Sequence, residues 1–171
     1  MKQLILGGAR SGKSRLAETR AKATGKKRVY LATGQAGDNE MAERIAIHKQ
    51  SRETDWQLIE EPTLLSRALS AADSPETAIV VDCLTLWLSN CLEQRCFLKE
   101  KKKLLNTIYT LQADVFFVSN EVGSGIVPLG ELSRTFVDES GWLHQALAEQ
   151  CDTVTLVVAG LPLELKGAFK S

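Results

Sequence analysis

Residues 4–14, LILGGARSGKS, most constrain what this chain can fold into. Gly7, Gly12, Lys13 and Ser14 have the spacing G-x-x-x-x-G-K-S, in which backbone N–H groups surround phosphate oxygens, the lysine reaches the outer phosphates and the hydroxyl binds Mg²⁺. The apolar residues before the glycines predict a buried strand, and residues 14–23 predict a helix whose N-terminus faces the anion. A glycine turn that matches by chance is the alternative, but it does not explain both flanking elements.

Strand-like and helix-like segments alternate along the chain. Continuous apolar runs of this kind suit strands that are buried on both faces, so the pattern predicts an α/β fold with a mainly parallel sheet and helices on both faces. We expect a single domain over residues 1–171. The predicted strands are residues 3–6, 28–31, 56–59, 78–81, 115–118 and 154–158, and the predicted helices are residues 14–23, 39–49, 64–72, 84–92, 99–111 and 131–149.

The carboxyl ends of the strands are where such sheets bind ligands. Thr33 and Gly34 follow the second strand, and we expect a hydroxyl and bare backbone near the phosphates there. Glu60 follows the third strand and is either a nucleotide contact or a solvated glutamate beside Glu61. Asp82 follows four apolar residues, as a magnesium-binding acid of a nucleotide site does, although a helix N-cap is the alternative. The sequence SNEVGSGIVP after the fifth strand predicts a shaped loop, whereas AGLPLELK after the last one shows no recognisable catalytic group.

Composition excludes several classes of protein. Lys and Arg together number 21 and so do Asp and Glu, so no net charge favours nucleic acid or an anionic membrane as a partner. The run KEKKK at 99–103 is interpreted as the solvated face of a helix. The four cysteines form no C-x-x-C pair and the two histidines cannot complete a zinc site, so we expect free thiols. The apolar stretch 78–88 is too short for a membrane span, and the pattern favours a cytoplasmic protein.

Four segments together resemble a known family: GGARSGKSRLAE, YLATGQAGDNEMAERIAIHK, the strand that ends at Asp82, and SNEVGSGIVP. They are similar to the bifunctional adenosylcobinamide kinase and adenosylcobinamide-phosphate guanylyltransferase of cobalamin assembly, over residues 4–160. The resemblance implies a RecA-like P-loop NTPase fold, a homotrimer, and the use of ATP or GTP with Mg²⁺. It also implies two reactions, phosphorylation of adenosylcobinamide and transfer of GMP from GTP to that phosphate through a GMP-histidine intermediate.

The resemblance assigns roles to particular residues. It makes His48 the GMP-accepting nucleophile, gives Lys13 and Asp82 catalytic roles, and places the metal at Ser14 and Asp82. Glu60 is matched with recognition of the guanine base or the ribose. The nucleotide-binding residues that it implies are Gly7, Gly8, Ala9, Arg10, Ser11, Gly12, Lys13, Ser14, Ala32, Thr33, Gly34, Lys49, Gln50, Ser51, Arg52, Glu60 and Asp82.

His48 has two interpretations on the residues alone. On a helix it shares a stripe with Met41 and Ile45, which is typical of a buried structural histidine. Its neighbours Lys49 and Arg52 favour neutral imidazole, the form that can attack phosphorus. The chain also departs from the family at two places, because His144 stands where relatives commonly have asparagine and the segment 91–105 is short and rich in lysine.

Two other functions remain open on the sequence. One is a plain small-molecule kinase that keeps the phosphate loop and Asp82 but forms no covalent intermediate. The other is a RecA-like module that binds nucleotide only to control assembly. A switch GTPase is excluded in its usual form, since no N-K-x-D motif follows a strand.

Overall fold

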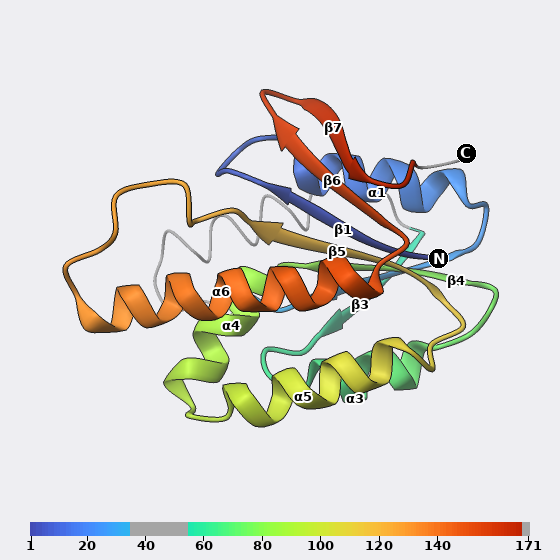
Figure 1. The fold of residues 1–171 in the computed structure, drawn as a ribbon. Coiled ribbons are helices and arrows are strands. Elements are labelled where there is room, and N and C mark those ends of the chain that lie inside the picture. The colour runs from blue at the N-terminus through green and yellow to red at the C-terminus, as the bar shows by residue number, and fades with distance from the viewer. Residues whose placement is uncertain (35–54, 169–171) are drawn as a thin grey trace.

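The structure is a computed structural model that describes residues 1–34 and 55–168. Its strands form one seven-stranded sheet in the order β3-β2-β4-β5-β1-β6-β7, and all pairings are parallel except that of β6 with β7 (Figure 1). The strands are β1 (Lys2–Gly7), β2 (Lys27–Ala32), β3 (Trp56–Glu60), β4 (Thr77–Asp82), β5 (Asp114–Asn120), β6 (Thr153–Val158) and β7 (Leu161–Lys166). The helices are α1 (Lys13–Ala23), α3 (Leu65–Ala72), α4 (Leu84–Glu93), α5 (Phe97–Ile108) and α6 (Glu131–Gln150).

Helices cover both faces of the sheet. Ala17 and Ala21 of α1 pack against one face, and α3, α4, α5 and α6 bury their apolar sides against the other, where Trp87 and Leu104 are fully enclosed. In the view of Figure 1, α1 lies beside the β6–β7 hairpin in the upper half, and α3, α4, α5 and α6 lie in the lower half. The central strands β4 and β5 are continuously apolar over residues 78–81 and 115–118 because both of their faces are covered. The predicted α/β class and parallel sheet are therefore confirmed.

The predicted elements differ from the structure at a few places. Each predicted strand is present, with ends that shift by one or two residues. Helix α5 begins at Phe97, two residues earlier than predicted, and ends at Ile108. Strand β7 is not among the predicted strands, because its sequence LPLELK contains no continuous apolar run. The predicted helix at 39–49 lies outside the described residues.

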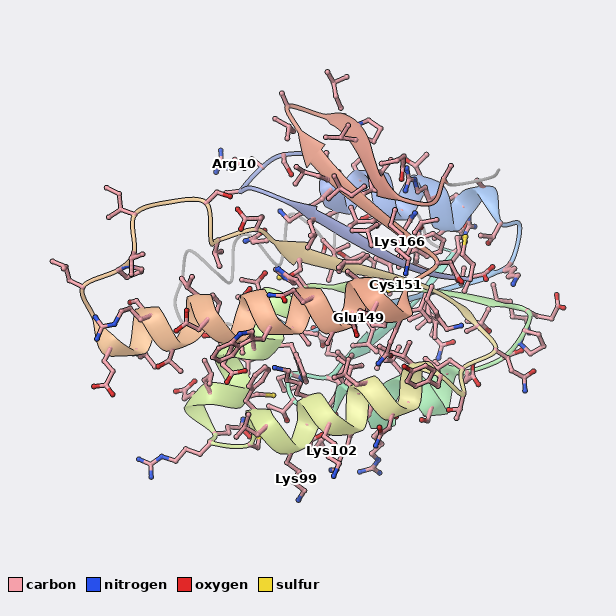
Figure 2. All side chains as sticks on the ribbon, in the orientation of Figure 1. Arg10, Lys99, Lys102, Glu149, Cys151 and Lys166 are labelled. Carbon is pink, nitrogen blue, oxygen red and sulfur yellow. The ribbon has the colours of Figure 1, made fainter. Side chains whose placement is uncertain are left out.

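The surface features that the sequence predicted are also present. Lys99 and Lys102 point away from the outer side of α5 (Figure 2), and Lys101 pairs with Glu139 of α6 at 3.1 Å, so the basic run is the polar face of a helix. All four cysteines are free thiols, as predicted. None of the helices in residues 1–34 and 55–168 is long and apolar enough to cross a bilayer.

The hairpin of β6 and β7 is fastened to α1 by a buried polar cluster. Arg20 of α1 donates to the Thr155 hydroxyl at 2.7 Å and forms an ion pair with Glu164 of β7. The Thr155 hydroxyl in turn donates to Glu164 at 2.7 Å. Because Arg20 is buried and its guanidinium is matched by this carboxylate, the contact fixes the hairpin beside the helix that follows the phosphate loop.

Candidate nucleotide site

The phosphate loop joins the end of β1 to the start of α1. Gly12 has φ of 96°, a left-handed conformation that favours glycine. At Gly7 a Cβ atom would lie 2.5 Å from the Ser11 Oγ and 2.6 Å from the Val157 carbonyl oxygen, so no side chain fits. Arg10 is exposed and its side chain extends into solvent (Figure 2). The two glycines therefore meet the steric demands that the motif predicted.

Lys13 lies at the N-terminus of α1 and is buried. Its Nζ donates a hydrogen bond of 2.9 Å to the carbonyl oxygen of Gly8, which keeps the amine at the loop. Burial lowers the pKa of Lys13, and the nearby Asp82 carboxylate opposes that shift. The charges of Lys13 and Asp82 therefore interact, as is expected of two groups that share a phosphate site.

Ser11 connects the phosphate loop to the turn between β6 and β7. Its carbonyl oxygen accepts a hydrogen bond of 2.9 Å from the N–H of Gly160, between β6 and β7. Its buried hydroxyl has no hydrogen-bond partner among the described residues. A buried polar atom without a partner is rare in proteins and is often found where a ligand binds.

The register of the sheet brings the predicted strand ends to one edge. Ala32 is paired with Glu60 on β3 and with Asp82 on β4, so these three residues lie side by side. On the next strands, Gly7 is paired with Asn120. The candidates from four different strands therefore share the carboxyl edge, as a parallel sheet dictates.

Asp82 is half-buried at this edge, and one of its carboxylate oxygens accepts a hydrogen bond of 2.6 Å from the Tyr30 hydroxyl. The alternative interpretation of Asp82 as a helix N-cap is wrong. Helix α4 begins at Leu84, its N-cap residue is Cys83, and no side chain caps it. The Asp82 carboxylate is therefore held by Tyr30 at the end of β4 and does not cap helix α4.

Thr33 corrects one expectation. Its hydroxyl donates to the Cys83 carbonyl at 2.6 Å and accepts the Cys83 N–H at 2.9 Å, and the residue is completely buried. Its own carbonyl accepts a bond of 2.8 Å from the Asn90 side chain. The hydroxyl therefore fixes the backbone next to Asp82 instead of facing phosphate.

Glu60 and Glu61 have different surroundings. The Glu61 carboxylate accepts the N–H groups of Thr63 at 3.0 Å and Leu64 at 2.8 Å, at the start of α3. Glu60 is the exposed member of the pair, at the end of β3. Of the two acids, Glu60 is therefore the one whose position suits a ligand.

In the sequence SNEVGSGIVP, Ser119 and Asn120 end β5, and the residues from Glu121 onward form a loop between β5 and α6, as predicted. The Asn120 N–H donates to the Thr85 hydroxyl at 2.7 Å, and the Glu121 N–H donates to the Gly7 carbonyl at 3.1 Å. Hydrogen bonds from Ser124 and from the Gly123 N–H hold the pKa of Glu121 below its usual range. The beginning of this loop is thus attached directly to the phosphate loop.

Several partners in these contacts were not predicted. The contacts of Tyr30, Thr85, Asn90 and Gly160 join residues that are 35 or more positions apart, so no local pattern marks them. Five predicted site residues lie outside the part of the chain that the structure describes: His48, Lys49, Gln50, Ser51 and Arg52.

The residues present fit a magnesium ion. The Asp82 carboxylate and the Ser14 hydroxyl are hard oxygen donors, which Mg²⁺ prefers. Within residues 1–34 and 55–168, no group of three or more His, Cys, Asp or Glu side chains is arranged to hold a metal by itself. Mg²⁺ usually takes only one or two protein ligands and fills its shell with water and phosphate oxygens, so this donor set is the expected kind.

A phosphate loop, its lysine and an acid at the end of a neighbouring strand define a nucleotide-binding protein of the RecA-like P-loop class. Two solved structures share this fold. The KaiC-like protein PH0186 of Pyrococcus horikoshii has a TM-score of 0.51 at 15% identity, covering 91% of this chain and 69% of that one. The RadB recombinase has a TM-score of 0.54 at 16% identity, covering 91% and 73%.

The sequence comparisons identify the family. The model of the family described as cobinamide kinase / cobinamide phosphate guanyltransferase matches residues 3–165. The bifunctional adenosylcobalamin biosynthesis protein CobP of Pseudomonas aeruginosa is 52% identical, with 98% of each chain covered. CobU of Salmonella typhimurium is 36% identical and CobU of Escherichia coli 34%, each covering 95% of this chain and 98% of the relative. The chain belongs to this family and is an enzyme.

Proposed function

We propose that this enzyme phosphorylates adenosylcobinamide with ATP or GTP and then transfers GMP from GTP to adenosylcobinamide phosphate. The observation that carries the proposal is the match to the family over residues 3–165, together with the phosphate loop, Lys13 and Asp82 at one edge of the sheet. We also infer a single domain over 1–171, a homotrimer and a cytoplasmic location. The exposed Ile126, Val127 and Leu129 are in line with a partner surface.

In the first reaction, the hydroxyl oxygen of the aminopropanol group attacks the γ phosphorus. The bond from that phosphorus to the β–γ bridging oxygen breaks, the nucleoside diphosphate leaves, and the hydroxyl proton passes to solvent. The loop N–H groups and Lys13 balance the negative charge on the phosphates. Ser14 and Asp82 are the residues that would hold Mg²⁺, which supplies further positive charge when bound.

In the second reaction, an imidazole nitrogen of His48 attacks the α phosphorus of GTP, and the bond from that phosphorus to the pyrophosphate oxygen breaks. A phosphate oxygen of adenosylcobinamide phosphate then attacks the same phosphorus and releases the histidine. Lys49 and Arg52 favour the neutral imidazole and balance charge on the pyrophosphate. Gln50 and Ser51 complete this part of the nucleotide site. Glu60 pairs with the N1–H and the exocyclic amine of guanine, which adenine cannot match.

Labelling with GTP that carries radioactive phosphorus in the α position tests the proposal. The wild-type enzyme should retain label in a phosphoramidate bond, which is labile in acid and stable in base. His48→Ala should lose this label and the guanylyl transfer, while ATP-dependent phosphorylation of the corrinoid remains. A plain kinase or an assembly module would leave no label on the wild-type protein. Label that persists in His48→Ala would contradict the assignment and direct attention to His144.

A further inference from the structure

The segment where the chain leaves β5 is held at three consecutive residues. The Ser119 Oγ lies 2.7 Å from Nε2 of His144, which is on α6. The next residue, Asn120, donates its N–H to the Thr85 hydroxyl at 2.7 Å. The following N–H, of Glu121, donates to the Gly7 carbonyl at the entrance of the phosphate loop, at 3.1 Å. Any displacement of this segment therefore reaches the phosphate loop through a direct backbone contact.

The Ser119 hydroxyl depends on His144. Ser119 is only 1% exposed, so water cannot easily replace a lost partner. The Thr85 hydroxyl is 3.4 Å away and already accepts the Asn120 N–H. All three groups are satisfied when Thr85 donates to Ser119 and Ser119 donates to an unprotonated Nε2 of His144, and this is the arrangement on which the proposal below is built. His144 is thus the acceptor at the end of a short chain of hydroxyl groups.

We propose that His144 is a positioning residue of the phosphoryl-transfer site, which fixes residues 119–121 against the phosphate loop by accepting a hydrogen bond from the Ser119 hydroxyl. The assay of this role rests on the proposed function. His144 acts through Ser119 and the backbone that follows it, and it does not touch the nucleotide in this role.

The charge state of His144 decides whether it can act in this way. Burial lowers the pKa of His144 from its ordinary value of 6.5, and the Glu121 carboxylate opposes the shift. The other polar groups that face its Nε2 are the hydroxyls of Ser119, from β5, and Thr85, from α4. Protonated imidazole can only donate, so below the pKa of His144 the Ser119 oxygen must accept from Nε2 and its own proton must turn away from the ring.

The test compares four single variants of the full chain and the double variant that combines His144→Leu with Ser119→Ala. His144→Leu removes the acceptor, His144→Gln supplies an amide oxygen of similar reach, and Ser119→Ala removes the donor. Glu139→Gln is the matched control, because it breaks the contact of α6 with Lys101 at 3.1 Å and leaves the β5 end untouched. For each variant we would measure thermal unfolding, the affinity for GTP, and kcat and KM of corrinoid phosphorylation between pH 5 and pH 8.

We expect kcat of His144→Leu and Ser119→Ala to fall about ten- to a hundredfold, the scale of a small misplacement in an active site. The double variant should lose no more than either single one, since both remove the same contact. His144→Gln should recover most of kcat, and it should lack the loss of activity that protonation of His144 is expected to cause in the wild type at a pH below the ordinary histidine pKa. Glu139→Gln should lower the melting temperature without lowering kcat.

Two results would overturn the proposal. One is a normal kcat in His144→Leu, and the other is a Glu139→Gln variant that loses as much kcat as His144→Leu at equal stability. A wild-type enzyme that binds GTP but does not phosphorylate the corrinoid would instead contradict the proposed function. In that case, the affinity for GTP and the effect of the variants on it still test the contact with the phosphate loop.

Discussion

The N–H of Gly160 and the carbonyl oxygen of Ser11 are joined by a hydrogen bond of 2.9 Å, which fastens the turn between β6 and β7 to the phosphate loop. The two segments are close enough that a Cβ atom on Gly12 would lie 3.4 Å from the Gly160 Cα. The phosphate loop is thus supported by a turn that lies 149 positions further along the chain.

This contact predicts a difference between two glycines. Gly160 has φ of 81° and Gly25 has φ of 68°, so both lie in the left-handed region. Gly160→Val and Gly25→Val should therefore lower the free energy of unfolding by similar amounts, on the order of 1–2 kcal/mol. Only Gly160 touches the phosphate loop, while a Cβ on Gly25 would meet nothing within 4 Å. We expect Gly160→Val to weaken GTP binding about tenfold, equivalent to about 1.4 kcal/mol, and Gly25→Val to leave it nearly unchanged. Titration calorimetry would measure both affinities.

Gly160→Asn should restore the affinity that Gly160→Val loses, because asparagine tolerates a left-handed backbone and keeps the N–H donor. Its affinity for GTP should lie close to that of the wild type. Equal losses of affinity in Gly160→Val and Gly25→Val would show that general destabilisation, and not support of the loop, is responsible.

Lys13→Met and Asp82→Asn should each impair both reactions. Phosphoryl and nucleotidyl transfer depend on balancing charge, so the loss of either group should lower the rate on the order of a thousandfold. Tyr30→Phe should have a smaller effect, because it removes only the 2.6 Å hydrogen bond that holds the carboxylate. Steady-state rates over a range of Mg²⁺ concentrations test this. Normal turnover with normal Mg²⁺ dependence in Asp82→Asn would reject the metal role.

Glu60→Gln should lower the preference for GTP over ATP by about tenfold, because a charged hydrogen bond to guanine is lost. Glu61→Gln is the matched control. It weakens the contacts with Thr63 and Leu64, at a cost in stability of about 0.5–2 kcal/mol, without changing the preference. Competition assays with the two nucleotides would measure the ratio. An unchanged ratio in Glu60→Gln would remove this residue from base recognition.

Asp114 should contribute stability that depends on pH. Burial raises its pKa, but hydrogen bonds from Lys26 and the Met1 ammonium group outweigh that effect and hold the pKa below 3.8. A lowered pKa in the folded state means that the contribution is complete above the unfolded pKa and is lost as the pH falls through the folded one. Urea unfolding between pH 7 and pH 2.5 should show a smaller acid loss for Asp114→Asn than for the wild type. Lys26→Met, which breaks the contact of 2.7 Å, should reduce the loss partly.

The sequence predicted most of the sheet because β1, β4 and β5 each contain a continuous apolar run, which is followed by glycine in β1 and by an acid in β4. Asp82, Glu60 and Gly7 were predicted to meet at one edge, and the register places them there. Strand β7 was missed although its leucines alternate with Pro162, Glu164 and Lys166, a period of two that is typical of a strand with one apolar face. Pro162 is tolerated there because β7 lies at the edge of the sheet.

The role of Thr33 could not be predicted in the same way. A threonine and a glycine after a strand suit a phosphate contact, but the partner of the Thr33 hydroxyl is the backbone of Cys83, 50 residues further on. His144 is similar, since its contact with Ser119 depends on how α6 crosses the sheet. Contacts of this kind require the tertiary arrangement and have no local signal in the sequence.

The position of β1 between β5 and β6 has a consequence for synthesis of the protein on the ribosome. The phosphate loop emerges before both strands that flank β1, which gains its neighbours only when residues 114–120 and 153–158 have also emerged. Until then the loop lacks the Gly7 contact with Glu121 and the Ser11 contact with Gly160. A nascent chain would therefore acquire its full affinity for nucleotide only after Gly160 has emerged.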